Sequence, residues 1–460
     1  MHEAGSNETG PIQARLSEFV AETGFEALPA TLVERLKWSL LDSLGCGLYG
    51  GATPWGRIVA DFARSQGQGA CRIWGVGDGA GVSATSAVLA NATAVQSFEI
   101  DDVHYASRSH PGSITVPVAL ALIESGAQVS GRQLIEALAV GYELQARVGV
   151  CQGVSSFNRG WHPTGTAGVF AAAATAARLL GLDAAATSHA LGIAGTMPAG
   201  LMAAQYGAMV KRLFVGHTAW AGLTGALLAQ RGLTGIPTIF EAEYGGYLKA
   251  VSDEIDLGAL DVELGQRFDG AAVGYKLFAC VGTNHTTLEA LAGLMRDHAF
   301  DWRDVQAVKV VTSEYQVLHS GWPYKPDSVM TAQMNMRYCV AVLLMQGQVF
   351  IDQFDERYLA DPSILELAGR VEVTADPGQD HKDRTARVTV RLTSGASFQA
   401  SCRAPRGHPD NPPTTADIEG KFLALAGTIL PAANCARIVE MVGGIERLDD
   451  VSQLPPLMVA

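Results

Sequence analysis

Two histidines that each precede a proline are the residues whose type and spacing most favour chemistry in this chain. They lie in His110-Pro111-Gly112-Ser113 and in His162-Pro163-Thr164-Gly165. Proline suits the first turn of an α-helix, so each histidine is predicted at or beside a helix N-cap. The unpaired N–H groups and the dipole at that position favour an anion and disfavour an imidazolium. Each ring should therefore stay neutral and available as a base.

Charged residues flank both motifs. Glu99-Ile100-Asp101-Asp102 comes shortly before His110, and Lys211-Arg212 follows the second motif within an apolar segment. Cations in apolar surroundings are usually paired or functional, so the combination predicts a site for a small carboxylate. Structural interpretations stay open for each part. A lone His-Pro can simply begin a helix, the acids can be solvated at a helix end, and Lys211 can extend its ammonium group to solvent.

A metal site is the alternative interpretation of the acidic segment from Glu99 to His104. No H-x-x-x-H or H-E-x-x-H spacing supports it. The cysteines are odd in number, scattered and without C-x-x-C spacing, which argues against an iron–sulfur cluster or a structural zinc. We therefore expect no metal and a reducing compartment. The seven cysteines are Cys46, Cys71, Cys151, Cys280, Cys339, Cys402 and Cys435.

The composition is that of an ordinary globular protein, with 48% hydrophobic and 17% charged residues among 460. Its formal net charge of −13 argues against nucleic acid and anionic membranes as partners, so any site for an anion must be locally positive. The 51 glycines, with abundant alanine, favour closely packed helices. Residues 1–10 are polar and no apolar run is long enough to cross a bilayer, so we expect a cytoplasmic protein.

The elements that must position these residues are mostly helices. Residues 11–268 show helical spacing of apolar residues, with Gly- and Pro-bearing turns between segments. Ser130 and Asp183 are predicted N-caps. The predicted helices span residues 32–48, 83–98, 114–125, 131–148, 166–180, 184–194 and 216–230.

The pattern changes to mixed α+β over residues 269–404. Helices are predicted over 283–298 and 329–344, and strands over 305–312, 371–375 and 384–392, the last two joined by a charged hairpin. A proline-rich linker then leads, within residues 405–460, to helices over 417–426 and 432–441. The predicted fold class is mainly α, a large helical domain with an inserted, smaller α+β lid domain, and the C-terminal helices are expected to return to the helical domain. Clefts between domains are common ligand sites.

The order and spacing of three motifs resemble the MmgE/PrpD family, over residues 12–443. These motifs are Glu99-Ile100-Asp101-Asp102 with His110-Pro111-Gly112-Ser113, then Trp161-His162-Pro163-Thr164-Gly165, then Lys211-Arg212-Leu213-Phe214-Val215-Gly216. The family includes 2-methylcitrate dehydratase, cis-aconitate decarboxylase and iminodisuccinate epimerase. The resemblance implies a helical domain with an α+β lid, a homodimer, and neither a metal nor an organic cofactor.

The resemblance also assigns residues to the site. It implies catalytic roles for His110, His162, Lys211, Asp102 and Tyr338. It implies substrate-binding roles for Glu99, Asp101, Arg212 and Lys276. This sequence departs from the dehydratase and decarboxylase pattern Asp-x-Asp-Asp-Thr, because Glu99 replaces the first aspartate and Val103 the threonine.

The reaction implied by the resemblance is removal of a proton α to a carboxylate on a small di- or tricarboxylate. A lyase, either a dehydratase or a decarboxylase, is the first interpretation. An epimerase for an iminodisuccinate-type dicarboxylate and a binding protein without turnover are the alternatives. We expect His110, His162 and Lys211 to share one pocket, with one neutral histidine as general base and the substrate as the partner.

Overall fold

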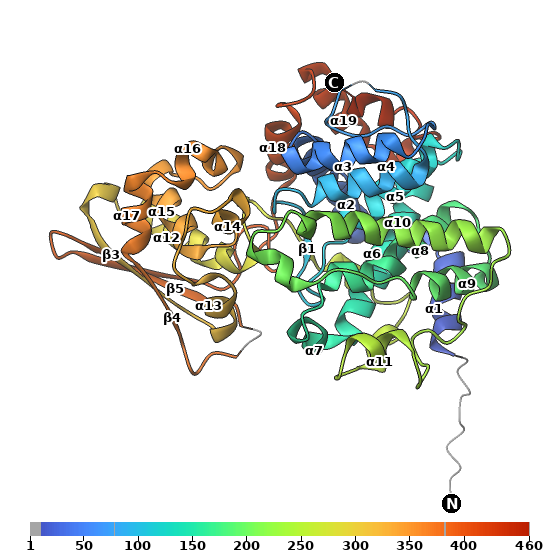
Figure 1. Ribbon diagram of the computed structural model, residues 1–460, viewed down its shortest axis with the longest axis horizontal. Helices are drawn as coiled ribbons and strands as arrows, with labels where there is room; N and C mark the ends of the chain where they lie inside the picture. The colour runs from blue at the N-terminus through green and yellow to red at the C-terminus, as the bar shows by residue number, and fades with distance from the viewer. Residues whose placement is uncertain (1–10, 78, 381–382, 460) are drawn as a thin grey trace, which may run out of the picture.

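The computed structural model describes residues 11–77, 79–380 and 383–459. Figure 1 shows a large helical body and a smaller unit of helices and strands beside it, so the mainly α fold class is confirmed. The first helices of the body are α1 (Ile12–Glu22), α2 (Ala30–Gly51), α3 (Pro54–Ser65), α4 (Ala84–Val95), α5 (Gly112–Glu124) and α6 (Gly131–Cys151). They are followed by α7 (Gly153–Asn158), α8 (Pro163–Leu179), α9 (Ala184–Ala194), α10 (Val210–Gln230) and α11 (Tyr247–Val251).

Small residues bring the central helices of the body close together. Helix α8 packs against both α6 and α10, and α10 also packs against α4 and α9. A Cβ added at Gly222 of α10 would lie 2.3 Å from the Cβ of Ala172 in α8. At Gly216 it would lie 2.2 Å from the carbonyl oxygen of Leu89 in α4. These glycines therefore set the helix separation, as the composition suggested, because no larger side chain fits there without moving the backbone.

The smaller unit is an α+β layer. Its strands alternate buried and exposed residues, and helices α12 and α15 cover the sheet. The strand order is β4-β3-β5-β6, with β3 parallel to β4 and the other pairs antiparallel. The strands are β3 (Val305–Thr312), β4 (Val371–Ala375), β5 (Ala386–Leu392) and β6 (Ser397–Cys402). The helices are α12 (His285–Asp297), α13 (Glu314–Ser320), α14 (Val329–Gln333), α15 (Met336–Gln346), α16 (Glu356–Leu359) and α17 (Pro362–Gly369).

Several elements differ from their prediction. The single helix predicted over 329–344 is two helices, α14 and α15, because Asn335 adopts an extended backbone and its side chain accepts the N–H of Tyr338 at 3.0 Å. Asparagine is a strong N-cap, and here it ends one helix and begins the next. Helices α1 and α3 and strand β6 have no counterpart in the sequence prediction. The predicted caps are confirmed, since the Ser130 side chain accepts from Gln133 and that of Asp183 from Ala186.

Two features connect the chain segments. Strand β1 (Val103–His104) pairs antiparallel with β2 (Val273–Gly274), which joins the loop before His110 to the segment that enters the α+β unit. Helices α18 (Thr415–Ala426) and α19 (Ala432–Gly443) return to the body, where α18 packs along α2. Lys421 of α18 pairs there with the buried Asp42 of α2. Both ends of the α+β unit are thereby attached to the helical body.

Across the described residues no helix is both long enough and apolar enough to span a bilayer. The polar segment 1–10, on which the expectation of no secretory leader rests, lies outside the described residues.

Candidate active site

The two histidines begin neighbouring helices. His162 is the N-cap of α8 with Pro163 in its first turn, and His110 lies just before Pro111, the N-cap of α5. The backbone N–H of His110 donates to the Thr164 hydroxyl at 3.1 Å, which links the two helix starts. The imidazole rings are nearly parallel, 18° apart, with centroids separated by 6.3 Å. Residues 52 positions apart in the chain are thus held face to face by two helix ends.

The loop between α4 and α5 carries the acids and is under local strain. Glu99 and Arg108 both have positive φ, 55° and 56°, in a region that residues other than glycine rarely adopt. Lys421, reaching in from α18, donates to the carbonyl oxygen of Ile100 in the same loop. A C-terminal helix therefore helps to hold the conformation of a loop more than 300 residues earlier in the chain.

Glu99 is the centre of a buried cluster of cations. Its Oε1 pairs with Lys211 and Arg212, both from the first turn of α10, and its Oε2 lies 3.3 Å from the Nζ of Lys276. Burial alone would raise the pKa of the Glu99 carboxyl, but the three cations hold it well below its usual value. One carboxylate thus faces three cations, and the cluster keeps positive charge in excess.

Asp101 orients His110. The Nδ1 of His110 donates to the carbonyl oxygen of Asp102 at 2.6 Å and lies 3.2 Å from a carboxylate oxygen of Asp101. Because a carbonyl oxygen can only accept, the Nδ1 atom carries a proton, and Nε2 is the nitrogen that exchanges protons. Burial opposes ionisation of Asp101, but His110 and Lys276 outweigh it, so the Asp101 pKa is lowered.

Asp102 has a different environment from its neighbour. Tyr142 donates to its Oδ2 at 2.6 Å and the Gly112 N–H to its Oδ1 at 3.1 Å. Burial, with additional repulsion from Asp42 and Asp101, raises the pKa of Asp102 to about 8 despite those hydrogen bonds. This carboxyl is therefore largely protonated at neutral pH and supports the start of α5.

His162 is held neutral. Burial lowers the pKa of its imidazole, and Lys211 and His110 lower it further, so that it lies well below the ordinary histidine value. Its Nδ1 has no hydrogen-bond partner among the residues that the structure describes. The direction matches the sequence expectation of a neutral histidine near cations, although burial is the larger cause. The pKa of the Lys211 ammonium is also lowered, first by burial and against the attraction of Glu99.

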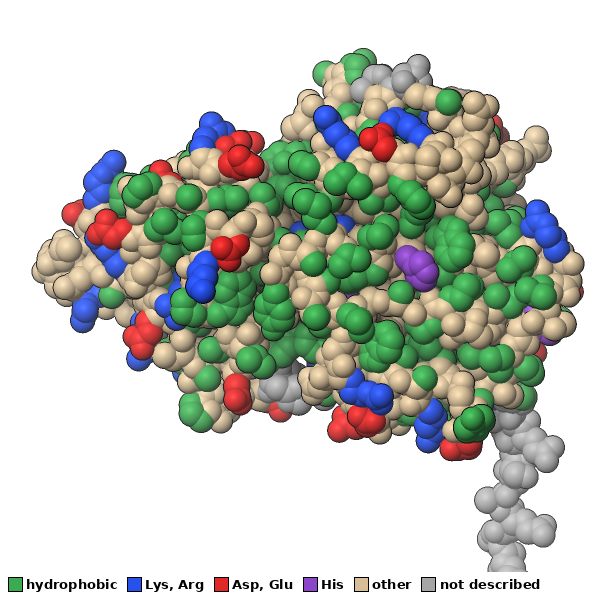
Figure 2. Space-filling model, in the orientation of Figure 1, with side chains coloured by type: hydrophobic (Ala, Val, Ile, Leu, Met, Phe, Trp, Pro, Cys, Tyr) green, Lys and Arg blue, Asp and Glu red, His purple; other side chains and the backbone are tan. Residues whose placement is uncertain are grey.

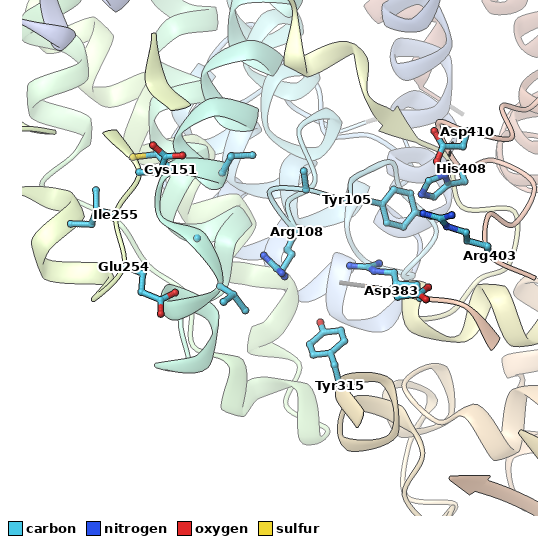
Figure 3. Close-up of a pocket in the computed structure, with 16 residues that line it drawn as sticks. Tyr105, Arg108, Cys151, Glu254, Ile255, Tyr315, Asp383, Arg403, His408 and Asp410 are labelled. Atoms are coloured by element: carbon cyan, nitrogen blue, oxygen red, sulfur yellow. Dashed lines mark hydrogen bonds and ion pairs between the residues drawn. The ribbon is translucent and has the colours of Figure 1, made fainter. Parts of the chain in front are cut away.

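These groups line a small inner cavity of about 80 Å³ at the junction of the helical body and the α+β unit. It opens beside a larger outer cavity of about 760 Å³, and Arg108, Tyr315 and Arg384 line both. Figure 3 shows the outer cavity, with Arg108 and the ring of Tyr315 pointing toward one another across it. Charged and aromatic groups from both parts of the fold therefore surround the entrance to the two histidines.

Most of the sequence-predicted site residues are brought together. Those lining the inner cavity are Glu99, His110, His162, Lys211 and Lys276. Asp101, Asp102 and Arg212 lie behind this lining and contact it through hydrogen bonds or ion pairs.

The structure contradicts the predicted site role of Tyr338. Its hydroxyl donates to the carbonyl oxygen of Gln353, and its ring packs against Tyr324 and Phe354 inside the α+β unit. It does not line the inner cavity. The resemblance implied a catalytic role for this residue, but its side chain is fully buried and its hydroxyl is taken up by a backbone carbonyl.

Sequence reasoning missed five polar or charged residues that line the inner cavity. Arg108 lies within the first motif and was passed over, whereas the others come from the α+β unit and are Thr283, Tyr315, His319 and Arg384. Burial lowers the pKa of His319 to about 4, so its ring is neutral. The only available signal was the position of Arg108 beside His110, because the other four reach the site through tertiary packing.

The described residues contain no group of three or more His, Cys, Asp or Glu side chains arranged to hold a metal ion.

Comparison with known proteins places the chain among relatives along its whole length. Family models match residues 14–258 as the MmgE/PrpD N-terminal domain and residues 278–446 as the MmgE/PrpD C-terminal domain. The cis-aconitate decarboxylase-like protein oryM of Aspergillus oryzae is 33% identical and covers 98% of each chain. A cis-aconitate decarboxylase of Aspergillus terreus is 31% identical over 99% of this chain and 97% of its own. The Homo sapiens cis-aconitate decarboxylase is 27% identical over 93% of this chain and 90% of its own. The chain therefore belongs to the MmgE/PrpD family.

Proposed function

We propose that this protein is a cofactor-independent lyase that decarboxylates a small polycarboxylate of the cis-aconitate type. The observation that carries the proposal is the inner cavity, in which His110 and His162 face each other beside Lys211 and Lys276. Buried cations suit a substrate with several carboxylates, and paired histidines suit proton transfer. The names of the relatives point to the same reaction.

The reaction needs one proton and releases one molecule of CO₂. Cis-aconitate carries a CH₂–COO⁻ arm on its carbon–carbon double bond. When the bond to that carboxylate breaks, its electron pair forms a new double bond to the central carbon. The electrons of the old double bond move to the outer carbon, which is α to a remaining carboxylate and takes the proton. The product is a dicarboxylate with a terminal methylene group.

The residues divide this work by their surroundings. His110, with Nδ1 fixed by Asp102 and Asp101, presents Nε2 as the atom that transfers the proton to or from the α-carbon. Lys211 and Lys276 stabilise the negative charge that develops on the carboxylate next to that carbon. His162 is neutral before the reaction, so it can hydrogen-bond the substrate or accept a proton.

We also propose that the α+β unit acts as a lid and that the active form is a homodimer. Lys276, Tyr315 and Arg384 lie in or next to this unit and line the cavities, so closure would surround the substrate and exclude water. The dimer follows from the family resemblance together with exposed apolar residues on α3 and near the start of α10.

The decisive experiment is incubation of the purified protein with cis-aconitate in deuterated water, followed by NMR. We expect release of CO₂ and a methylene dicarboxylate that carries one deuterium α to a carboxylate. Dialysis against EDTA should leave the rate unchanged. A His110→Ala variant controls for contaminating activity, and Arg391→Gln, an exposed position on β5, controls for the effect of substitution itself.

Other outcomes of this experiment would indicate a different activity at the same site. Water loss from citrate or 2-methylcitrate would indicate a dehydratase, and deuterium exchange with inversion of an aspartate-derived dicarboxylate would indicate an epimerase. Tight binding of these acids without exchange or product would indicate a binding protein. Each of these outcomes would contradict the decarboxylase proposal while keeping the site.

A further inference from the structure

Arg108 and Arg384 stand at the junction of the inner and outer cavities, and both line each cavity. Arg108 comes from the strained loop of the helical body, and Arg384 comes from the residues just before β5 in the α+β unit. Both side chains are half-buried. We call the shared boundary of the two cavities, lined by Arg108, Tyr315 and Arg384, the neck, and it carries one arginine from each part of the fold.

Neither guanidinium has an ion-pair or hydrogen-bond partner among the described residues. Arg384 instead lies over the ring of Tyr105, with its Cζ atom 5.0 Å from the ring centroid. Burial lowers the pKa of Arg108, and the nearby Arg384 adds to that effect, while Tyr315 opposes it. Two half-buried guanidinium groups close enough to repel each other are unfavourable, and an anion between them would offset that cost.

The small size of the inner cavity indicates that such an anion would be a carboxylate of the substrate itself. At about 80 Å³ it is far smaller than the roughly 300–1,000 Å³ typical of small-molecule sites. A tricarboxylate seated between the histidines must therefore extend part of its length into the neck.

We propose that Arg108 and Arg384 form a two-sided clamp for a substrate carboxylate that is retained in the product, and that this clamp selects tricarboxylates over shorter acids. The inference rests on the proposed polycarboxylate substrate. A guanidinium binds a carboxylate through two parallel hydrogen bonds, so each arginine can hold one face of the group. Because the arginines belong to different parts of the fold, the bound carboxylate also holds the α+β unit against the helical body.

The test measures ligand binding without turnover. Isothermal titration calorimetry compares propane-1,2,3-tricarboxylate, which has no double bond, with propanedioate, which is short enough to remain in the inner cavity. Arg108→Gln and Arg384→Gln should each weaken binding of the tricarboxylate by about tenfold or more, and change propanedioate binding by less than about threefold. Arg391→Gln, on an exposed position of β5, should match the wild type for both ligands.

Two further measurements separate a clamp from a structural effect. The double variant should lose less affinity than the product of the single losses, because both arginines hold one carboxylate. Arg384→Lys should recover part of the affinity, and thermal unfolding should show that each variant is folded.

The proposal is overturned if the wild type does not prefer the tricarboxylate, or if the glutamine variants retain that preference. Decarboxylation of cis-aconitate by the wild type is scored separately. The clamp can therefore stand where the proposed reaction fails, and can fail where the reaction stands.

Discussion

His110 and His162 begin neighbouring helices, yet the partners of their ring nitrogens give them different chemistry. His110 has Nδ1 fixed by the Asp102 carbonyl and the Asp101 carboxylate, whereas the Nδ1 of His162 has no partner among the described residues. Sequence reasoning gave both rings the same character, because it rested on the helix dipole. The difference comes from acids folded against one ring only, and those contacts depend on the loop that precedes α5.

Replacing either histidine tests the roles proposed for the two rings. His110→Ala should lower kcat by roughly 10²-fold or more, because a positioned proton-transfer group contributes about that factor. His162→Ala should lower kcat by a comparable factor for the same reason. Steady-state kinetics with the candidate substrate, with thermal unfolding as a check on folding, measure both. Full activity in both variants would exclude the histidines and leave Lys211 as the candidate.

The raised pKa of Asp102 predicts how the free energy of unfolding changes with pH. Its folded-state pKa is about 8, above the unfolded value of about 3.9, so the carboxyl ionises more easily in the unfolded chain. The folded state therefore loses stability through this group as pH rises from about 4 toward 8. Relative to Asp102→Asn, the wild type should lose a few kcal/mol of unfolding free energy across that range. Urea titrations at several pH values measure the difference, and parallel profiles for the two proteins would contradict the assignment.

Single elements were predictable where a local signal defines them. Proline after His162, Ser130 before α6 and Asp183 before α9 each mark a helix start, and the structure has those helices. The prediction failed at Asn335, where an N-cap divides a continuous apolar pattern. It also gave no role to Lys421, because its contact with Ile100 joins residues 321 positions apart. Long-range contacts of this kind leave no pattern in a single sequence.

The contact of α18 with the loop between α4 and α5 can be separated from its contribution to stability. Lys421→Met leaves the buried Asp42 unpaired and should cost roughly 3–5 kcal/mol of unfolding free energy. Adding Asp42→Asn should restore most of that stability, because the uncompensated charge is gone. The double variant should still show a reduced kcat, since the Ile100 carbonyl has lost its donor and the loop carrying Glu99 and Asp101 is less well held.

Chemical denaturation and steady-state kinetics on the two variants measure these effects. Wild-type kcat in the double variant would show that α18 does not position the loop.

The whole molecule places its site where three parts of the chain meet. The helical body supplies both histidines, the α+β unit supplies Arg384, and the returning helix α18 supports the loop between them. The proposed inserted lid rests on this arrangement, because both ends of the α+β unit are attached to the body. The family resemblance and the three motifs could indicate the site, but the sequence could not show that the two cavities share one neck.

The proposed homodimer can be tested by substitutions on one exposed surface of the molecule. Figure 2 shows hydrophobic side chains spread over the face on which α3 and α10 lie. Ile58 and Phe62 of α3 are exposed, as are Met209 and Val210 at the start of α10. Exposed apolar residues that gather on one face mark interaction surfaces more often than scattered ones do. The double variant Ile58→Lys/Phe62→Lys should therefore sediment as a monomer, because two charges would be buried without partners in a dimer. Tyr244→Lys, at a fully exposed position elsewhere, should leave the sedimentation coefficient unchanged. A monomeric wild type, or a double variant that still dimerises, would place the interface elsewhere or remove it.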